Sequence, residues 1–305
     1  MIEKTFIFGA GYSGKAFAAA RRDRAVGIAG TTRTAEKFDQ LRAAGVAPLA
    51  FDGEALTGDV AAQLAGTTHL IVSIAPGEAG DPVLNAARDA ITAAMPKLAW
   101  IGYLSTVGVY GDHAGGWVDE ESECRPVSRR SVMRVAAESE WLALGEETGL
   151  PVAVLRLSGI YGPGRNAFVN LEKGTAKRLV KPGQVFNRIH AADIAGALWH
   201  LAERDQGGIF NVTDDLPAPP QDVVAYAAGL MGVEPPPEIA FESAELSPMA
   251  RSFYGENKRV SNARLKQSGY RFLYPDYRAS FAAMWADGTW RGGGDSDARS
   301  AMKRS

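Results

Sequence analysis

Short apolar runs alternate with longer segments of helical periodicity through the first half of the chain. The strand-like runs are "TFIFG" (5–9), "AVGIAGTT" (25–32), "VAPLAF" (46–51), "THLIVSIA" (68–75), "LAWIGYLS" (98–105) and "PVAVLRLS" (151–158). The helical patterns lie between them, at about 12–22, 35–44, 57–65, 82–95 and 129–147. Continuous apolar strands that alternate with helices are typical of a parallel sheet covered on both faces. The pattern predicts an α/β fold with a doubly wound parallel sheet.

The pattern changes after Tyr161. The stretch "GIYGPGRNAF" is rich in turn residues, a helix is expected from about Ala191, and "GIFNVTDD" reads as a late strand. Proline-rich pieces and two helical segments, near 261–268 and 275–290, follow. We expect three parts, which are a sheet domain over 1–160 that regains about 185–213, a smaller lobe over most of 161–290, and a disordered tail over 291–305.

Three glycines lie between the first predicted strand and the first predicted helix. Gly9, Gly11 and Gly14 form G-x-G-x-x-G in the context that gives this motif meaning. The first glycine permits a tight turn, the second lets the backbone approach a pyrophosphate, and the third permits close packing of helix on strand. Tyr12 and Ser13 complete a helix start that favours phosphate. The loop predicts dinucleotide binding on a Rossmann-type sheet; the alternative is a purely structural glycine turn.

The residues after the second and third strands bear on the choice of cofactor. Sites that prefer NAD usually carry an acid after the second strand, whereas this chain has "GTTRT", with Arg33. An arginine can form charge-assisted bonds to a 2′-phosphate, so we expect NADP, with NAD as the alternative. Asp52 is expected to accept from the adenine amino group. Arg33 as a solvated residue and Asp52 as an ordinary turn residue remain the other readings.

Composition narrows the remaining possibilities. The 305 residues carry a net charge of −2 and are 46% hydrophobic, which is ordinary for a globular enzyme-sized domain and argues against general nucleic-acid or membrane-surface binding. Cys124 is the only cysteine, so a reducing compartment fits, and the N-terminus does not read as a signal peptide. We expect a cytoplasmic protein with no membrane span and no metal site. The oligomeric state stays open.

Five motifs carry a resemblance to a known family. "GAGYSG", "YLSTVGVYGD", "RPVSRRSVMRVAAE", "LRLSGIYGPGR" and "RIHAADIAGAL" occur in family order and at family spacing over about residues 1–213. The chain resembles an atypical extended short-chain dehydrogenase/reductase of the NAD(P)-dependent epimerase/dehydratase-like group. The segment "NKRVSNARLKQSGYRFLYPDYRASF" resembles the C-terminal part of a poorly characterised branch of that group. The resemblance implies a Rossmann-type fold, an NAD(P) cofactor and a small-molecule substrate held by the C-terminal lobe.

The resemblance also implies a Ser/Thr–Tyr–Lys set, of which only one member is present. Thr106 lies four residues before the tyrosine of "VYG" and occupies the Ser/Thr position; its alternative role is to satisfy local backbone groups. Counting back from "AAE" places Arg130 in the tyrosine position and Arg134 in the lysine position. Arginine stays protonated, so this pair cannot act as an acid–base couple. The chain therefore departs from the family pattern at its usual proton donor.

The two arginines still have a chemistry of their own. Residues four apart share a helix face, so Arg130 and Arg134 present a doubly cationic edge suited to a substrate anion or to the cofactor. The alternative is a solvated basic face. If a proton moves, Tyr161 is the first candidate and His190 the second.

The resemblance also implies a role in substrate binding for two more arginines. Arg165 and Arg188 lie where members of the family contact an anionic substrate, whereas Asp193 is expected to be structural. These features favour an oxidoreductase or epimerase/dehydratase-like enzyme acting on a small polar, anionic metabolite. The alternative is an NAD(P)-binding sensor or regulatory protein without turnover, which the arginine pair favours.

Overall fold

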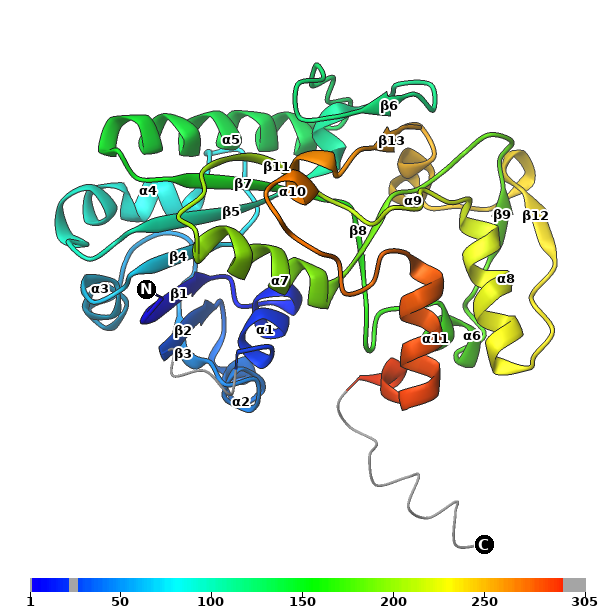
Figure 1. Ribbon diagram of the computed structural model, residues 1–305, viewed down its shortest axis with the longest axis horizontal. Helices are drawn as coiled ribbons and strands as arrows, with labels where there is room; N and C mark the ends of the chain where they lie inside the picture. Colours follow the sequence, from blue (N-terminus) through cyan, green and yellow to red (C-terminus); the bar gives the residue numbers. More distant parts are fainter. Residues whose placement is uncertain (1, 22–26, 293–305) are drawn as a thin grey trace, which may run out of the picture.

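A computed structural model describes residues 2–21 and 27–292 of the chain, without the side chains of 248–250 (Figure 1). At its centre lies a sheet of seven strands in the order β11-β7-β5-β4-β1-β2-β3, and every neighbouring pair is parallel. The strands are β1 (Lys4–Phe8), β2 (Gly27–Thr32), β3 (Ala47–Ala50), β4 (His69–Val72), β5 (Trp100–Thr106), β7 (Val152–Leu157) and β11 (Gly208–Val212). The predicted Rossmann-type, doubly wound α/β fold is confirmed.

Helices cover both faces of this sheet. One face carries α1 (Tyr12–Ala19), α2 (Phe38–Ala43), α7 (Ala191–Ala202) and α10 (Ala263–Gln267); the other carries α3 (Gly58–Ala65), α4 (Pro82–Asp89) and α5 (Arg129–Thr148). Figure 1 shows α5 and α7 on opposite sides of the strands. The strands β4 and β7 are buried at every position, which is why their sequences are mainly apolar without alternation; the exceptions are His69 and Arg156.

The starts of the long helices follow from local sequence. Asp81 accepts the backbone N–H groups of Val83 and Leu84 at the start of α4, with Pro82 in the first turn, where its missing N–H costs nothing. Ser128 accepts the N–H of Ser131 at the start of α5. These caps hold the beginning of each helix near the carboxyl edge of the sheet.

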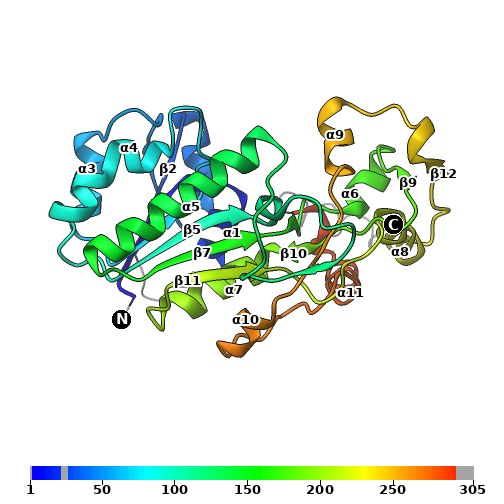
Figure 2. The ribbon, with the colours of Figure 1, turned by 90° about the horizontal axis from the view of Figure 1, so that it is seen from above.

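The smaller lobe lies beyond the carboxyl ends of the strands (Figures 1 and 2). It contains α6 (Ala167–Glu172), α8 (Pro220–Met231), α9 (Pro248–Phe253), α11 (Tyr277–Asp287) and the pair β9 (Arg178–Val180) with β12 (Glu238–Ala240). Its core centres on Phe168 and Phe281, whose ring centroids lie 5.0 Å apart. The sequence pattern did not predict α8, because the prolines that precede and begin it read as a loop.

Two short parallel pairs join the lobe to the sheet. β8 (Gly159–Tyr161) pairs with β10 (Arg188–His190), and β6 (Trp117–Val118) pairs with β13 (Arg259–Val260). The remaining short turns are η1 (Ala35–Lys37), η2 (Ala90–Ala94), η3 (Val107–Tyr110), η4 (Phe241–Ser243) and η5 (Thr289–Arg291). The first pair sets the side chains of Tyr161 and His190 next to each other, far apart as they are in sequence.

Asp193 near the start of α7 ties the C-terminal segment to this framework. Its carboxylate accepts hydrogen bonds from the hydroxyl of Tyr270 and from the backbone N–H groups of Leu273 and Tyr274. Within residues 2–21 and 27–292, no helix combines the length and apolar character that crossing a membrane requires. The division into domains stays a prediction, and residues 293–305 of the expected tail lie outside the described residues.

We expect Phe281→Ala to lower the free energy of unfolding by about 3–5 kcal/mol, because the change empties the centre of the smaller lobe. The control is Leu273→Ala, whose side chain is 64% exposed and should change stability by no more than about 0.5 kcal/mol. Urea denaturation of both variants measures the difference. Equal stabilities would mean that the lobe has no cooperative core around Phe281.

Candidate cofactor and substrate site

The glycine loop joins β1 to α1 at the carboxyl edge of the sheet, and each glycine is required for a different reason. Gly9 has φ +79°, and a Cβ there would lie 2.8 Å from Ile74. A Cβ on Gly14 would lie 3.2 Å from Ile7 of β1, so this glycine lets the helix pack closely on the strand. A Cβ on Gly11 would meet nothing nearer than the Gly9 carbonyl oxygen at 3.9 Å. Of these three glycines, only the one expected to face a pyrophosphate has open space beside it.

Thr31 of β2 holds this loop in place. The hydroxyl of Thr31 accepts the N–H of Gly9 at 2.9 Å, and its carbonyl oxygen accepts the N–H of Ala10 at 2.8 Å. No side chain caps the N-terminus of α1, which begins at Tyr12. The N–H groups and the partial positive charge of this helix start suit a phosphate group. The geometry therefore fits a dinucleotide, with the open side of Gly11 as its cradle.

Arg33 and Asp52, which are expected to contact the adenosine half of the cofactor, lie beside the glycine loop at the carboxyl edge of the sheet. Arg33 follows the end of β2 and is exposed, and Asp52 follows β3 and is also exposed. One carboxylate oxygen of Asp52 accepts the N–H of Glu54 at 2.9 Å, as in an ordinary turn, which leaves its other oxygen for a ligand. Because β3, β2 and β1 are neighbours, these residues and the glycine loop form one continuous row.

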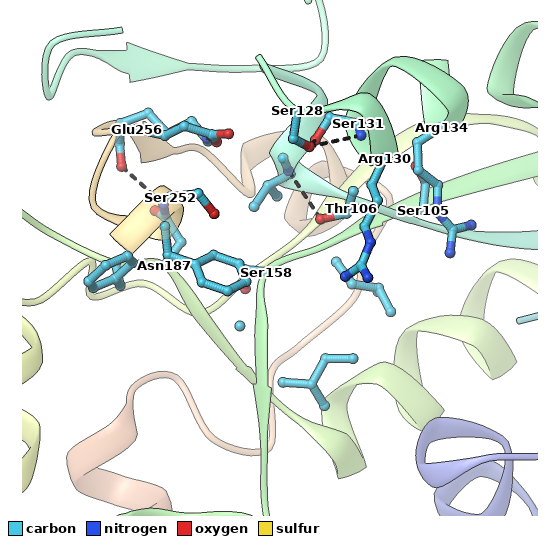
Figure 3. A pocket seen from close by; sticks show the side chains of 18 of the residues that line it. Ser105, Thr106, Ser128, Arg130, Ser131, Arg134, Ser158, Asn187, Ser252 and Glu256 are labelled. Carbon is cyan, nitrogen blue, oxygen red and sulfur yellow. Dashed lines mark hydrogen bonds and ion pairs between the residues drawn. The ribbon is translucent and has the colours of Figure 1, made fainter. Parts of the chain in front are cut away.

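On the other side of the glycine loop, a cavity of about 1200 Å³ opens beyond the ends of β5 and β7 (Figure 3). Its walls come from the end of β5, the first turns of α5, the segment 157–161, and residues 185–188 and 252–258. Thr106 lies at the end of β5, where its hydroxyl oxygen accepts the N–H of Gly108 at 3.1 Å. The hydroxyl hydrogen of Thr106 remains able to donate to a ligand.

Arg130 and Arg134 enter the cavity from the first two turns of α5 (Figure 3). One terminal nitrogen of Arg134 donates to the hydroxyl of Tyr103 at 2.8 Å and to the carbonyl of Leu104 at 2.9 Å, so this guanidinium is partly fixed to the wall. Arg130 forms no ion pair with any carboxylate of residues 2–21 and 27–292. A cation in the first turn of a helix faces the positive end of the helix dipole, so an anion nearby would relieve an unfavourable arrangement.

The cavity as a whole is strongly cationic. The only carboxylate in its wall, within the part of the chain that the structure describes, is Glu256, which forms an ion pair with Lys258 at 2.6 Å. Arg129 is paired as well, with Glu78 at 2.8 Å. The basic side chains in the wall are Arg129, Arg130, Arg134, Arg165, Arg188 and Lys258. A chain with a net charge of −2 thus gathers positive charge at one place, which suits an anionic ligand.

Arg188 is a partly buried cation of this set. Its guanidinium donates to the carbonyl oxygens of Phe186 at 2.8 Å and Ala218 at 3.0 Å. The nearby acid is Asp214, whose second carboxylate oxygen is buried without a hydrogen-bond partner, and burial raises the pKa of Asp214 to about 8. Burial thus disfavours the charged form of the Asp214 carboxyl, the acidic group near Arg188.

The two candidate proton donors, Tyr161 and His190, lie side by side, and each forms a hydrogen bond within the protein. The hydroxyl of Tyr161 forms a 2.7 Å hydrogen bond with Ser280, and burial raises the pKa of Tyr161. The Nδ1 atom of His190 accepts the N–H of Ala192, and burial lowers the pKa of His190 to about 4. Tyr161 lines the cavity and His190 lies behind it, with ring centroids 5.4 Å apart. A role in proton transfer stays a prediction for each.

A buried polar network connects the helix of the two arginines to the sheet. Glu138 of α5 accepts hydrogen bonds from Arg156 of β7, at 2.7 Å for the closest pair, and from the hydroxyl of Ser105. Arg156 also donates to Tyr110, which in turn donates to Asn211 at 2.8 Å. The side chains of Glu138 and Arg156 are 4% and 5% exposed. The network fixes the position of α5 relative to the end of β5.

Several residues of this site could not be found by the sequence reasoning. Thr31, Ser105 and Lys258 each position or line the site, but a single hydroxyl or lysine far from a motif carries no signal in one sequence. A buried partner for Arg156 could have been suspected, because this charged residue lies in an apolar segment, whereas Glu138 carries no such signal. No group of three metal-ligating side chains occurs in the described part of the chain.

The comparison with family models now adds to this geometry. Residues 6–213 match the NAD dependent epimerase/dehydratase family, and the chain belongs to that family. Protein YeeZ of Escherichia coli K12 is 28% identical over 288 residues, which cover 90% of this chain and 97% of YeeZ.

Solved structures agree with the fold. A functionally unknown conserved protein from Silicibacter pomeroyi is 46% identical, with a TM-score of 0.85 over 94% of this chain and 99% of that one. A human epimerase family protein with NADPH is 17% identical and has a TM-score of 0.71 over 93% and 99% of the two chains, a likeness of fold. The site described above therefore lies in a member of the epimerase/dehydratase family.

We expect Gly11→Val to abolish binding of NADPH and NADH without lowering stability appreciably, because the new side chain fills open space that the protein does not use. Calorimetric titration of the variant measures its affinity for the two cofactors, and thermal unfolding measures its stability. The control is Gly58→Ala in the first turn of α3, where a Cβ also meets nothing within 4 Å. Equal cofactor affinity in Gly11→Val and the wild type would remove the glycine loop from the site.

Proposed function

We propose that the chain is an NAD(P)-dependent enzyme, of the oxidoreductase or epimerase/dehydratase type, that acts on a small polar and anionic metabolite. The observation that carries the proposal is the pairing of a dinucleotide cradle with a cationic cavity at the same edge of the sheet. The family assignment supports the cofactor and the general type of enzyme. When bound, the nicotinamide group would accept or donate a hydride.

The proposed site residues fall into two groups, one that binds the cofactor and one that binds the substrate. Gly9, Gly11, Tyr12, Ser13 and Gly14 would form the pyrophosphate loop. Its glycines allow the turn and the close approach, and the backbone N–H groups at the start of α1 would face the phosphates. The other proposed contacts to the cofactor are Arg33, Asp52 and Arg134. The proposed substrate anion contacts are Arg130, Arg165 and Arg188. A cytoplasmic location remains an expectation from the sequence.

We infer NADP as the preferred cofactor, with NAD as the alternative. Arg33 is exposed directly after β2, without an acid at the end of that strand to repel a 2′-phosphate. The name of the family points to NAD, whereas the human structure of the same fold contains NADPH. The proposal therefore rests on Arg33.

Thr106 and Arg130 would act on the reacting end of the substrate. The hydroxyl of Thr106 accepts from Gly108 and is left to donate to a substrate oxygen. Arg130 would neutralise an anionic group or a developing oxyanion, because it donates hydrogen bonds but gives up no proton. Tyr161 is the first candidate for the proton itself and His190 the second. Tyr161 would have to leave its hydrogen bond with Ser280 before it could act, whereas only Nδ1 of His190 is engaged and its Nε2 has no hydrogen-bond partner.

A cofactor-binding sensor without turnover is the second candidate function. The engagement of Tyr161 and the absence of an acid at positions 130 and 134 favour it. An activity assay separates the two functions: the wild type with NADP and a panel of hydroxy acids, sugar acids and sugar phosphates is followed at the absorbance of NADPH for a net oxidation. Chromatography of each substrate detects an epimerisation or dehydration, in which the hydride returns to the substrate. Turnover of any of these substrates establishes an enzyme. Tight cofactor binding with no turnover across the panel favours the sensor.

Arg33→Ala should weaken NADPH binding by about 1.5–3 kcal/mol, the range of a charge-assisted hydrogen bond, and leave NADH nearly unchanged. Calorimetric titration with both cofactors gives the comparison. Arg42→Ala serves as the control, since Arg42 is an exposed arginine of α2 that pairs with Asp39. Equal losses for the two cofactors, or a wild type that prefers NADH, would contradict the role of Arg33.

Arg130→Ala should weaken the binding of anionic ligands about tenfold or more and leave the affinity for NADPH nearly unchanged, because the lost group is a cation of the substrate cavity. Titration with carboxylates and phosphates in the presence of NADPH measures both. Any pH–rate profile should keep all its pKa values, since arginine does not titrate there. Arg125→Ala, an exposed arginine paired with Glu123, is the control. If Arg130→Ala binds every ligand as the wild type does, the arginine belongs to a solvated face.

A further inference from the structure

The side chain of Tyr12 connects the glycine loop to the loop that carries Arg165. Tyr12 is the first residue of α1, and its hydroxyl donates a hydrogen bond to the carbonyl oxygen of Pro163 at 3.0 Å. The guanidinium carbon of Arg165 lies 5.9 Å from the centre of the Tyr12 ring. Arg165 also lines the substrate cavity. One side chain thus contacts both the proposed cofactor loop and a proposed substrate cation.

The loop at the other end of this contact is a closed turn. The N–H of Gly162 donates to the carbonyl of Arg165, and the N–H of Arg165 donates to the carbonyl of Gly162, both at 3.0 Å. Asn166 donates to the carbonyl of Gly162 at 2.8 Å and to that of Trp290 at 2.7 Å. The residues from Gly162 to Arg165 are therefore linked to one another, so that a displacement of Pro163 would move Arg165 with it.

The contact lies in a tightly packed junction. A Cβ on Gly162 would lie 2.7 Å from the Tyr12 hydroxyl oxygen and 3.3 Å from Nε2 of His190. That Nε2 atom is buried and has no hydrogen-bond partner. Burial raises the pKa of Tyr12 to about 12, so the hydroxyl keeps its proton and remains a donor at any physiological pH. The Tyr12 hydroxyl can therefore donate to the Pro163 carbonyl throughout the physiological pH range.

We propose that Tyr12 is a positioning residue, which couples occupation of the glycine loop to the placement of Arg165 in the substrate cavity. The inference rests on the proposed function in one respect, namely that the loop binds a dinucleotide. A pyrophosphate at Gly11 and at the N-terminus of α1 would immobilise Tyr12, and Tyr12 would in turn order the turn that carries Arg165. Because such coupling is reciprocal, an anion held by Arg165 would tighten cofactor binding by the same factor.

Hydrogen exchange with and without NADPH tests the coupling directly. In the wild type, NADPH should slow the exchange of the backbone amides of 162–166 about three- to tenfold, since ordering the turn suppresses local opening. In Tyr12→Phe, these amides should exchange faster without cofactor and respond little to NADPH at a concentration that saturates the variant. The control is Tyr226→Phe, which removes a hydroxyl that donates to the carbonyl of Arg278 elsewhere in the lobe.

A double-mutant cycle with inorganic phosphate as the probe tests the second end of the coupling. With NADPH bound, Tyr12→Phe and Arg165→Ala should each weaken phosphate binding about three- to tenfold. The double variant should be no weaker than Arg165→Ala, because Tyr12 acts only through Arg165. Additive losses, or equal protection of 162–166 in Tyr12→Phe and the wild type with NADPH bound, overturn the coupling and leave the proposed function standing. A wild type that binds neither NADPH nor NADH overturns both.

Discussion

The ion pair between Glu138 and Arg156 determines where the site residues of helix α5 can be. Both side chains are almost completely removed from water, and the pair joins the middle of α5 to strand β7, which lies between β5 and β11 in the sheet. Such a pair contributes little net stability, because desolvation of the two charges offsets their attraction. Its contribution is orientation, since an α5 that rotated or slid would leave two charges buried without partners. The beginning of the helix, with Arg130 and Arg134, is therefore held beside the end of β5.

The parallel sheet explains why the remaining site residues meet. All seven strands run in one direction, so the loops after β1, β2, β3 and β5 emerge along one edge. In open sheets of this type ligands bind at that edge, near the point where the order of the strands reverses. Here the reversal falls between β1 and β4, beside the glycine loop. A chain of nearly neutral overall charge can in this way concentrate six basic side chains around one cavity.

The surroundings of the cavity bear on the replacement of the family's tyrosine and lysine by Arg130 and Arg134. A tyrosine needs a lowered pKa to act as an acid–base group, whereas the tyrosines near this cavity that are buried have raised pKa values, Tyr103 and Tyr161 among them. One terminal nitrogen of the Arg134 guanidinium already donates hydrogen bonds to the Tyr103 hydroxyl and the Leu104 carbonyl. The wall of the cavity thus carries mainly positive charge, and of the two candidate proton donors Tyr161 is engaged with Ser280 whereas Nε2 of His190 has no hydrogen-bond partner.

Periodicity and the glycine motif by themselves determined the Rossmann-type sheet, most of its helices and the place of the dinucleotide loop. Buried parallel strands must be continuously apolar and the phosphate turn must lack side chains, so both leave a local signal. The same sequence could not indicate helix α8, the pairing of Tyr161 with Ser280, or the contact of Tyr12 with Pro163, a residue 151 positions away. These depend on which distant segments share a space, and only the packed tertiary structure decides that, because side-chain hydrogen bonds and burial are set by neighbours and not by spacing.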